Sequence, residues 1–287
     1  MKEYLIKVDG EISNKKIENA LKQKLNLSDN IIKKIKYGCI YLNDKLVTNI
    51  NNRVELGDLI KIVLPPDEPC EFTSINNYPI KVVYEDEYIL AVLKPRGMLT
   101  HNSKGNSMPA LDGAVMNYIN QPFTFRAINR LDRDTSGIVL IAKDMISACA
   151  FGELMKKGKI TKKYQALIVG EPIKNSFIIE APIDRESPTS MKRVVSENGK
   201  YAKTECISIK GLNNGLSVAK ILLHTGRTHQ IRVHFAHAGY PLFADSLYGN
   251  AVCGKTYSLH AGEIEFTHPF TNEKLLLTAE IELENAT

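Results

Sequence analysis

The stretch RAINRLDRDTSGIVLIAK, residues 126–143, joins a charged loop to an apolar strand. The Thr-Ser-Gly turn at 135–137 leads into an uninterrupted apolar run at 138–142, which is typical of a buried strand. Asp132 therefore lies on a loop that a rigid strand holds in place, a suitable position for a nucleophile or a base. The pattern alone favours a simpler interpretation, an exposed loop whose aspartates pair with Arg126, Arg130 and Arg133.

Outward from this stretch, the chain carries further short apolar runs at wide spacing. Four of them predict strands: IKVVYED (80–86), YILAVLKP (88–95), KYQALIV (163–169) and SVAKILL (217–223). Leu111, Val115 and Ile119 recur at helical spacing, which predicts a helix over 110–119. Strands and helices do not alternate regularly, so the sequence predicts an α+β fold with a mixed, mostly antiparallel sheet.

The first part of the chain has the pattern of a separate, small α/β domain over residues 1–64. Its predicted elements are a helix over 14–25, a second helix capped by Ser28 and ended near Gly38, and strands over 39–42 and 59–64. Pro65 and Pro66 open a polar, turn-rich linker over 65–78. The remaining residues, 79–287, form the predicted larger domain.

Three lysines, Lys33, Lys34 and Lys36, lie on and beside the second helix of the small domain. Lysines on one helix face can neutralise the phosphates of a nucleic acid. A solvated basic face with no partner explains the same pattern equally well.

The composition is that of an ordinary globular chain, with 287 residues and a formal net charge of +5. This mild positive excess fits nucleic-acid binding and excludes nothing. The five cysteines are an odd number without close spacing, so they indicate reduced thiols rather than a disulfide framework or a zinc ribbon. No signal peptide and no membrane-spanning stretch can be recognised, and we expect a cytoplasmic monomer with no membrane partner.

A second polar stretch, LLHTGRTHQIRVHFAHAG at 222–239, predicts a helix that starts at Thr228 and ends before Gly239. Arg227 then lies just ahead of the helix, where its planar guanidinium could clamp a carboxylate or a phosphate. An amphipathic helix with ordinary solvent contacts remains the alternative.

A metal site is a weaker interpretation of the same region, which holds His224, His229, His234 and His237. These histidines form no HExxH pattern, and no cysteine or carboxylate lies between them. Asp132 and Asp134 could hold a divalent cation, but three neighbouring arginines oppose this. The sequence therefore predicts no metal.

Several blocks in order resemble the RluA-type RNA pseudouridine synthases over about residues 79–284. The blocks are LAVLKPRGMLTH (90–101), RLDRDTSG (130–137), KKYQALIVG (162–170), TGRTHQIRVH (225–234), PLFADSLYG (241–249) and LHAGEIEFTHP (259–269). Residues 12–64 resemble the alpha-L RNA-binding domain, in which an arginine usually stands where this chain has Asp29. The larger domain departs twice from its family pattern: Asn129 replaces a usual histidine, and Ala244 replaces a usual glycine.

The resemblance implies that Asp132 is the catalytic residue, that Tyr164 lines the uridine pocket, and that Arg227 pairs with Asp132. We expect RNA contacts from Arg130, Lys163 and the three lysines of the small domain. Further phosphate contacts could come from Lys156, Lys157, Lys159, Lys192 and Arg193. The expected substrate is ribosomal or transfer RNA, and neither the RNA nor the uridine can be chosen from the sequence.

Pseudouridine formation is an isomerisation, so it consumes no redox cofactor and no group donor, and we expect no cofactor. Asp132 would either attack the ribose or abstract a proton from it, and both routes need the ionised carboxylate. Two other functions remain as alternatives. One is a non-catalytic RNA-binding protein that retains the fold; the other is a glycoside or nucleoside hydrolase with a second acid near Asp132.

Overall fold

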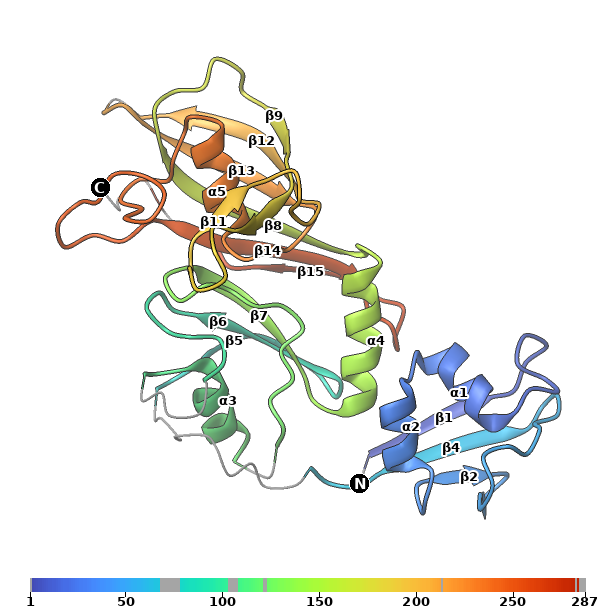
Figure 1. Cartoon of the computed structure of the whole chain (residues 1–287). Coiled ribbons are helices and arrows are strands. Elements are labelled where there is room, and N and C mark those ends of the chain that lie inside the picture. Colours follow the sequence, from blue (N-terminus) through green and yellow to red (C-terminus); the bar gives the residue numbers. More distant parts are fainter. Residues whose placement is uncertain are drawn as a thin grey trace.

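The computed structural model describes residues 2–67, 78–102, 108–120, 123–212, 214–281 and 283. Most of the predicted linker, residues 68–77 with Cys70, lies outside the described residues. Figure 1 shows a small N-terminal part in blue beside a larger part built on one long twisted sheet. No helix in the described part of the chain is long and apolar enough to cross a membrane.

The small part is a four-stranded antiparallel sheet with two helices, and its strand order is β1-β4-β2-β3. Its elements are β1 (Lys2–Lys7), α1 (Ile17–Leu25), α2 (Asp29–Ile35), β2 (Ile40–Leu42), β3 (Lys45–Leu46) and β4 (Leu59–Leu64). The predicted cap is confirmed, because the Ser28 hydroxyl accepts a hydrogen bond from the backbone N–H of Ile31. The first helix begins three residues later than predicted, after Asn14 has turned the backbone into the left-handed region.

The larger part has the strand order β5-β6-β7-β14-β8-β13-β12-β9, with β15 paired to β14. Among the described strands only β7 and β14 run parallel, which confirms the mixed, mostly antiparallel α+β fold. The strands are β5 (Lys81–Glu85), β6 (Ile89–Lys94), β7 (Ser136–Ala142), β8 (Ile160–Val169), β9 (Phe177–Glu180), β12 (Lys203–Gly211), β13 (Leu216–Leu223), β14 (Leu259–Thr267) and β15 (Lys274–Thr278).

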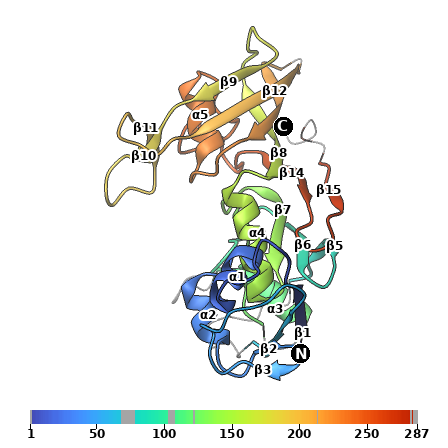
Figure 2. The ribbon, with the colours of Figure 1, turned by 90° about the vertical axis from the view of Figure 1, so that its right-hand side faces the viewer.

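Three helices and one hairpin complete this part. They are α3 (Leu111–Ile119), α4 (Met145–Lys156), α5 (Gln230–His237) and the pair β10 (Ile183–Arg185) and β11 (Arg193–Val195). Figure 2 shows the β10–β11 hairpin projecting away from the sheet. Helix α5 begins at Gln230, two residues after the predicted start, and the backbone turns at Gly239 (φ 86°) just past its end.

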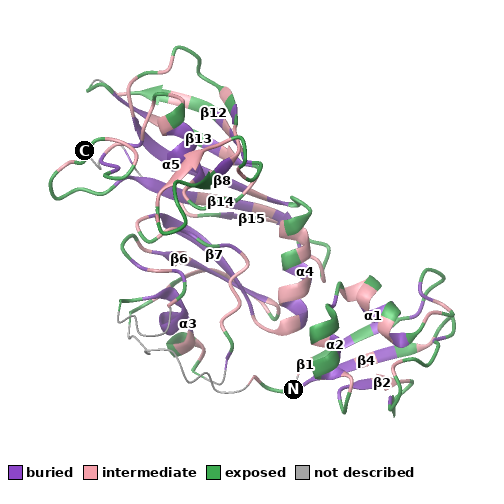
Figure 3. Cartoon of the chain, in the orientation of Figure 1, coloured by how far each residue is buried: buried purple, intermediate pink, exposed green. Residues whose placement is uncertain are grey.

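Strand β7 is the most deeply buried strand of the sheet, since all seven of its residues are buried (Figure 3). It lies between β6 and β14, and Gly137 pairs directly with Ala261 of β14. The backbone at Gly137 has φ 127°, and a Cβ added there would lie 2.3 Å from the Ala261 carbonyl oxygen. Only glycine fits at this crossing, because any side chain would push the two strands apart.

The small part is docked on the larger one through buried polar contacts. The Tyr4 hydroxyl donates to the Asp144 carboxylate at 2.7 Å and lies 2.9 Å from the Ser147 hydroxyl. The Lys2 ammonium binds the same carboxylate at 2.7 Å. Ile146 of α4 belongs to the apolar core of the small part, so the two parts share buried surface. In Figures 1 and 2 the small part lies against α4 accordingly.

The close crossing of β7 and β14 predicts that Gly137→Ala destabilises the fold strongly. The added methyl group meets backbone atoms, and the backbone conformation is one that alanine avoids, so we expect a loss of about 3–5 kcal/mol. Gly152→Ala is the matched control, because Gly152 is exposed in α4 and has open space around it. This change should stabilise the protein by up to about 1 kcal/mol. Denaturant unfolding measures both, and equal stabilities of the two variants would contradict the packing described.

Candidate functional site

The loop that carries Asp132 is held to β7 by a buried asparagine. The Asn129 side-chain amide donates to the Ile138 carbonyl at 3.1 Å, and its oxygen accepts from the Leu140 N–H at 2.8 Å. These two contacts continue the backbone hydrogen bonds that residues 126–128 make with β7. Asn129 stands where the family usually has histidine. Its side chain attaches the loop to β7, because both its amide N–H and its oxygen bind the backbone of that strand.

The other side of the loop is fixed by a threonine and a lysine. The Thr100 hydroxyl donates to the Leu131 carbonyl at 2.8 Å and accepts from the Leu131 N–H at 3.1 Å. Lys94 is completely buried, and its ammonium donates to the carbonyls of Pro95, Met98 and Arg133 at 2.7 to 3.0 Å. Burial lowers the pKa of Lys94 to about 8. The backbone on both sides of Asp132 is thus immobilised.

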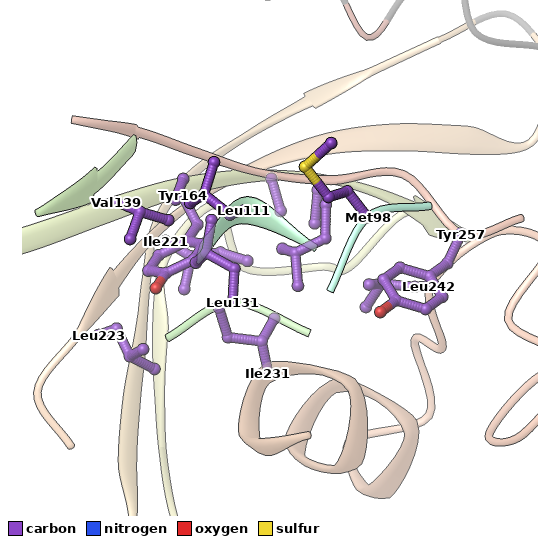
Figure 4. Close-up of a cluster of buried hydrophobic side chains, with 14 of the residues drawn as sticks. Met98, Leu111, Leu131, Val139, Tyr164, Ile221, Leu223, Ile231, Leu242 and Tyr257 are labelled. Atoms are coloured by element: carbon purple, nitrogen blue, oxygen red, sulfur yellow. The ribbon is translucent and has the colours of Figure 1, made fainter. Parts of the chain in front are cut away.

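The Asp132 side chain is half-buried, and its negative charge reaches a group of aromatic and basic side chains. Burial raises the pKa of Tyr164 and that of Tyr257, and the charge of Asp132 raises both further. The same charge acts on His229 and on Arg232. Tyr164, on β8, lies with Leu131 and Tyr257 in one cluster of buried side chains (Figure 4). The charge of Asp132 thus acts on Tyr164, the aromatic residue that the resemblance places in the uridine pocket.

A buried ion pair lies next to this group. The Arg232 guanidinium binds the Asp245 carboxylate through two hydrogen bonds of 2.7 Å. It also lies over the rings of Tyr248 and Tyr257, 4.9 and 4.2 Å from their centroids. Both charges are nearly inaccessible to water, so the bidentate geometry compensates for their desolvation. The sequence did not predict Arg232, Tyr248 or Tyr257 as site residues, although the first two lie in blocks quoted for the resemblance.

The expected contact between Arg227 and Asp132 is not formed in this structure. The Arg227 side chain is exposed, and its Nε donates to the Tyr201 carbonyl at 3.0 Å. Its backbone N–H donates to the side chain of Gln230 at 2.9 Å, which fixes the turn before α5. The backbone then turns through the left-handed conformation of His229. Arg227 contacts Tyr201, whereas Arg232 contacts Asp245. Arg232 is the arginine on which the charge of Asp132 acts.

The arginines next to Asp132 in sequence also contact other residues. Arg126 binds Asp67 at 2.8 Å, and Arg133 binds Asp134 at 2.9 Å. Arg130 is exposed. The charge of Asp132 acts on two cations from elsewhere in the fold, Lys94 of β6 and Arg232 of α5.

The lysines predicted to bind RNA differ in their surroundings. Lys33 and Lys34 are exposed on α2, and the Lys36 ammonium lies 4.5 Å from the centroid of the exposed Tyr37 ring. None of these three forms an ion pair with a described residue. Lys163 instead binds Glu263 of the neighbouring strand β14. Asp29, which replaces the usual arginine, binds Lys22 at 2.6 Å.

The four histidines do not gather around a common point. His224 binds Glu205 at 2.8 Å, and His234 lies 2.8 Å from the Thr204 hydroxyl. His229 lies 2.8 Å from the Tyr248 hydroxyl. Across the residues described, no three potential metal ligands lie together.

Comparison with known proteins gives a consistent result. The sequence model described as RNA pseudouridylate synthase matches residues 88–237, which is more than half of the chain. The chain is 33% identical to ribosomal large subunit pseudouridine synthase D of Buchnera aphidicola, over 84% of this chain and 82% of the relative. It is 32% identical to ribosomal large subunit pseudouridine synthase C of Rickettsia typhi, over 70% of this chain and 67% of that protein.

Solved structures agree with this relationship. Human RNA pseudouridylate synthase domain containing 1 superimposes with a TM-score of 0.59 at 27% identity, covering 74% of this chain and 86% of the human one. Together with the ordered blocks around Asp132, Tyr164 and Arg232, these matches show that the chain belongs to the RluA-type RNA pseudouridylate synthase family, whose reaction is an intramolecular isomerisation.

Proposed function

We propose that this protein converts specific uridines of ribosomal RNA to pseudouridine with Asp132 as the catalytic residue. One observation carries the assignment of Asp132: its loop is fixed at both ends, while its half-buried carboxylate shares an environment with Tyr164 and Arg232. The relatives named for the large ribosomal subunit favour ribosomal RNA over transfer RNA as the substrate.

The reaction breaks the bond between N1 of uracil and C1′ of ribose and forms a bond between C5 and C1′. The proton of C5 is lost and N1 gains one, so substrate and product are isomers. Asp132 either attacks C1′ or removes a proton from the ribose, and in both routes the ionised carboxylate is the reactive form. A fixed backbone keeps this carboxylate in a productive position without further ordering when the substrate binds.

The side chains around Asp132 have separate tasks in this proposal. Arg232 supplies a positive charge to the environment of Asp132, and Asp245 holds that guanidinium in place. The Tyr164 ring provides an apolar surface for the uracil. Since these groups lie at a half-buried loop, the target nucleotide must leave its helix to reach them.

Asp132→Asn should abolish pseudouridine formation while the protein stays folded and binds RNA. The change keeps the size of the side chain but removes its charge and nucleophilicity. Asp134→Asn is the matched control. This carboxylate binds the exposed guanidinium of Arg133, so the variant should keep substantial activity. Single-turnover assays on ribosomal RNA measure both, with thermal unfolding alongside. Product from Asp132→Asn, after back-deamidation to aspartate is excluded, would remove the assignment.

Arg227→Ala should weaken RNA binding more than it slows the chemical step. Among the described residues the exposed guanidinium hydrogen-bonds to one backbone carbonyl, so it can turn toward a phosphate. We expect a single-turnover rate at saturating enzyme within about threefold of the wild type, because removing a phosphate-binding group affects mainly affinity. A rate loss of a hundredfold with unchanged binding would instead show that Arg227 reaches Asp132 in the RNA complex.

The small part, residues 1–64, is proposed to increase RNA affinity without taking part in the chemistry. Its exposed lysines on α2 form no ion pair with a described residue, so their charges remain available for phosphates. Deleting this part would expose Ile146, Tyr88 and Phe270, which pack against its core. Point variants are therefore a cleaner test than a truncation.

Replacing Lys33, Lys34 and Lys36 together by alanine should lower RNA affinity and reduce its dependence on salt. For each phosphate that is no longer neutralised, the slope of log K against log salt should fall by roughly 0.7 to 0.9. The control replaces Lys81, Lys174 and Lys274, three exposed lysines scattered over the larger part. Both triple variants lose the same charge, so equal salt slopes would argue against a binding surface on α2.

A further inference from the structure

His229 has a strained backbone next to the proposed catalytic site. It precedes α5 with φ 58° and ψ 16°, a left-handed conformation that is uncommon for residues other than glycine and that asparagine, aspartate and histidine adopt more often than the rest. No capping hydrogen bond from its side chain compensates for this strain. Strain of this kind persists where the surrounding structure fixes a side chain for another purpose.

The imidazole of His229 is held in place by a chain of two hydrogen bonds. The backbone N–H of Arg193, on β11, donates to the Tyr248 hydroxyl at 2.8 Å. The same hydroxyl lies 2.8 Å from Nδ1 of His229. The phenol oxygen accepts from Arg193 and its single proton remains for Nδ1, which is the arrangement in which the phenol and the imidazole are both satisfied. A neutral His229 then carries its own proton on Nε2.

The charges around His229 favour this neutral form. Burial lowers the pKa of His229, and the cations Arg232 and Arg193 lower it further. The carboxylates of Asp132 and Asp245 act in the opposite direction. Nε2 has no hydrogen-bond partner among the described residues, and it is absent from their buried unsatisfied atoms. A neutral N–H donor is therefore available on a residue on which the charge of Asp132 acts.

We propose that His229 is a catalytic hydrogen-bond donor whose Nε2–H binds a carbonyl oxygen of the target uracil. The proposal rests on the assignment of Asp132 as the catalytic residue. When the N1–C1′ bond breaks, its electron pair moves into the uracil ring, and negative charge grows on the carbonyl oxygens. A fixed N–H donor stabilises that charge and keeps the base close while it turns, and the proton stays on Nε2. Tyr248 is the positioning residue that sets the tautomer.

The test compares His229→Gln with His229→Asn in single-turnover assays on ribosomal RNA. Glutamine places an N–H donor near the position of Nε2, whereas asparagine places one near Nδ1 and tolerates the left-handed backbone well. We expect a rate loss of about 100-fold or more for asparagine and of less than about 10-fold for glutamine. RNA affinity should change less than about threefold in both, because phosphate contacts dominate it.

Equal rates for the two variants, or a loss of affinity that accounts for the loss of rate, would overturn the proposal. The Asp132→Asn variant distinguishes an error in the role of His229 from an error in the proposed catalytic site. If Asp132→Asn is inactive while both His229 variants keep the wild-type rate, only the role of His229 is wrong. If Asp132→Asn is active, the proposed site itself is wrong.

The tautomer has its own readout. In ¹⁵N spectra of the wild-type protein, His229 should show a protonated Nε2 and an unprotonated Nδ1 at neutral pH. Tyr248→Phe should mix the two tautomers and lower the single-turnover rate by about 10-fold or less, since it removes one neutral hydrogen bond of about 1 kcal/mol. A protonated Nδ1 in the wild type, or an unchanged tautomer in Tyr248→Phe, would contradict the chain of hydrogen bonds.

Discussion

The two hydrogen bonds between the Asn129 side chain and the backbone of β7 are the constraint on which the site depends. They occupy a buried C=O and a buried N–H just where the chain turns away from the strand. Without them these groups would be desolvated and unpaired, at a cost of about 1–3 kcal/mol each. The same contacts fix the start of the loop that carries Asp132. Strand β7 thus acts both as the centre of the core and as the support of the reactive carboxylate.

Lys94 completes this support from the opposite side. A buried ammonium with three carbonyl partners joins the end of β6 to the loop at Arg133. With a pKa of about 8 it remains mostly protonated at neutral pH, and the low polarity around it strengthens each contact. The protein therefore holds a reactive loop with polar groups that are buried and satisfied, while the Asp132 side chain stays available for the substrate.

Much of this arrangement could be predicted from the sequence. Apolar runs in the sequence predicted the strands β4 to β8 and β13. The ordered blocks of the family resemblance pointed to Asp132 and Tyr164. The edge strand β1 was missed because its partner β4 lies far along the chain. Arg232 was missed for another reason: the helical residue is buried only through its pairing with Asp245, which sequence spacing does not reveal. Sequence proximity was also misleading for Arg126, which binds the distant Asp67, whereas Arg133 binds Asp134 of its own loop.

The two departures from the family pattern differ in their effect on the fold. Asn129 supplies a donor and an acceptor to β7, and Ala244 adopts φ 60°, a conformation in which glycine is unstrained. The measurement that tests the central claim most directly is pseudouridine mapping of total RNA from cells in which Asp132→Asn replaces the wild-type protein. The account predicts that the variant, at normal abundance, loses the same modified positions as a deletion of the gene. Retention of those positions in the variant cells would contradict it.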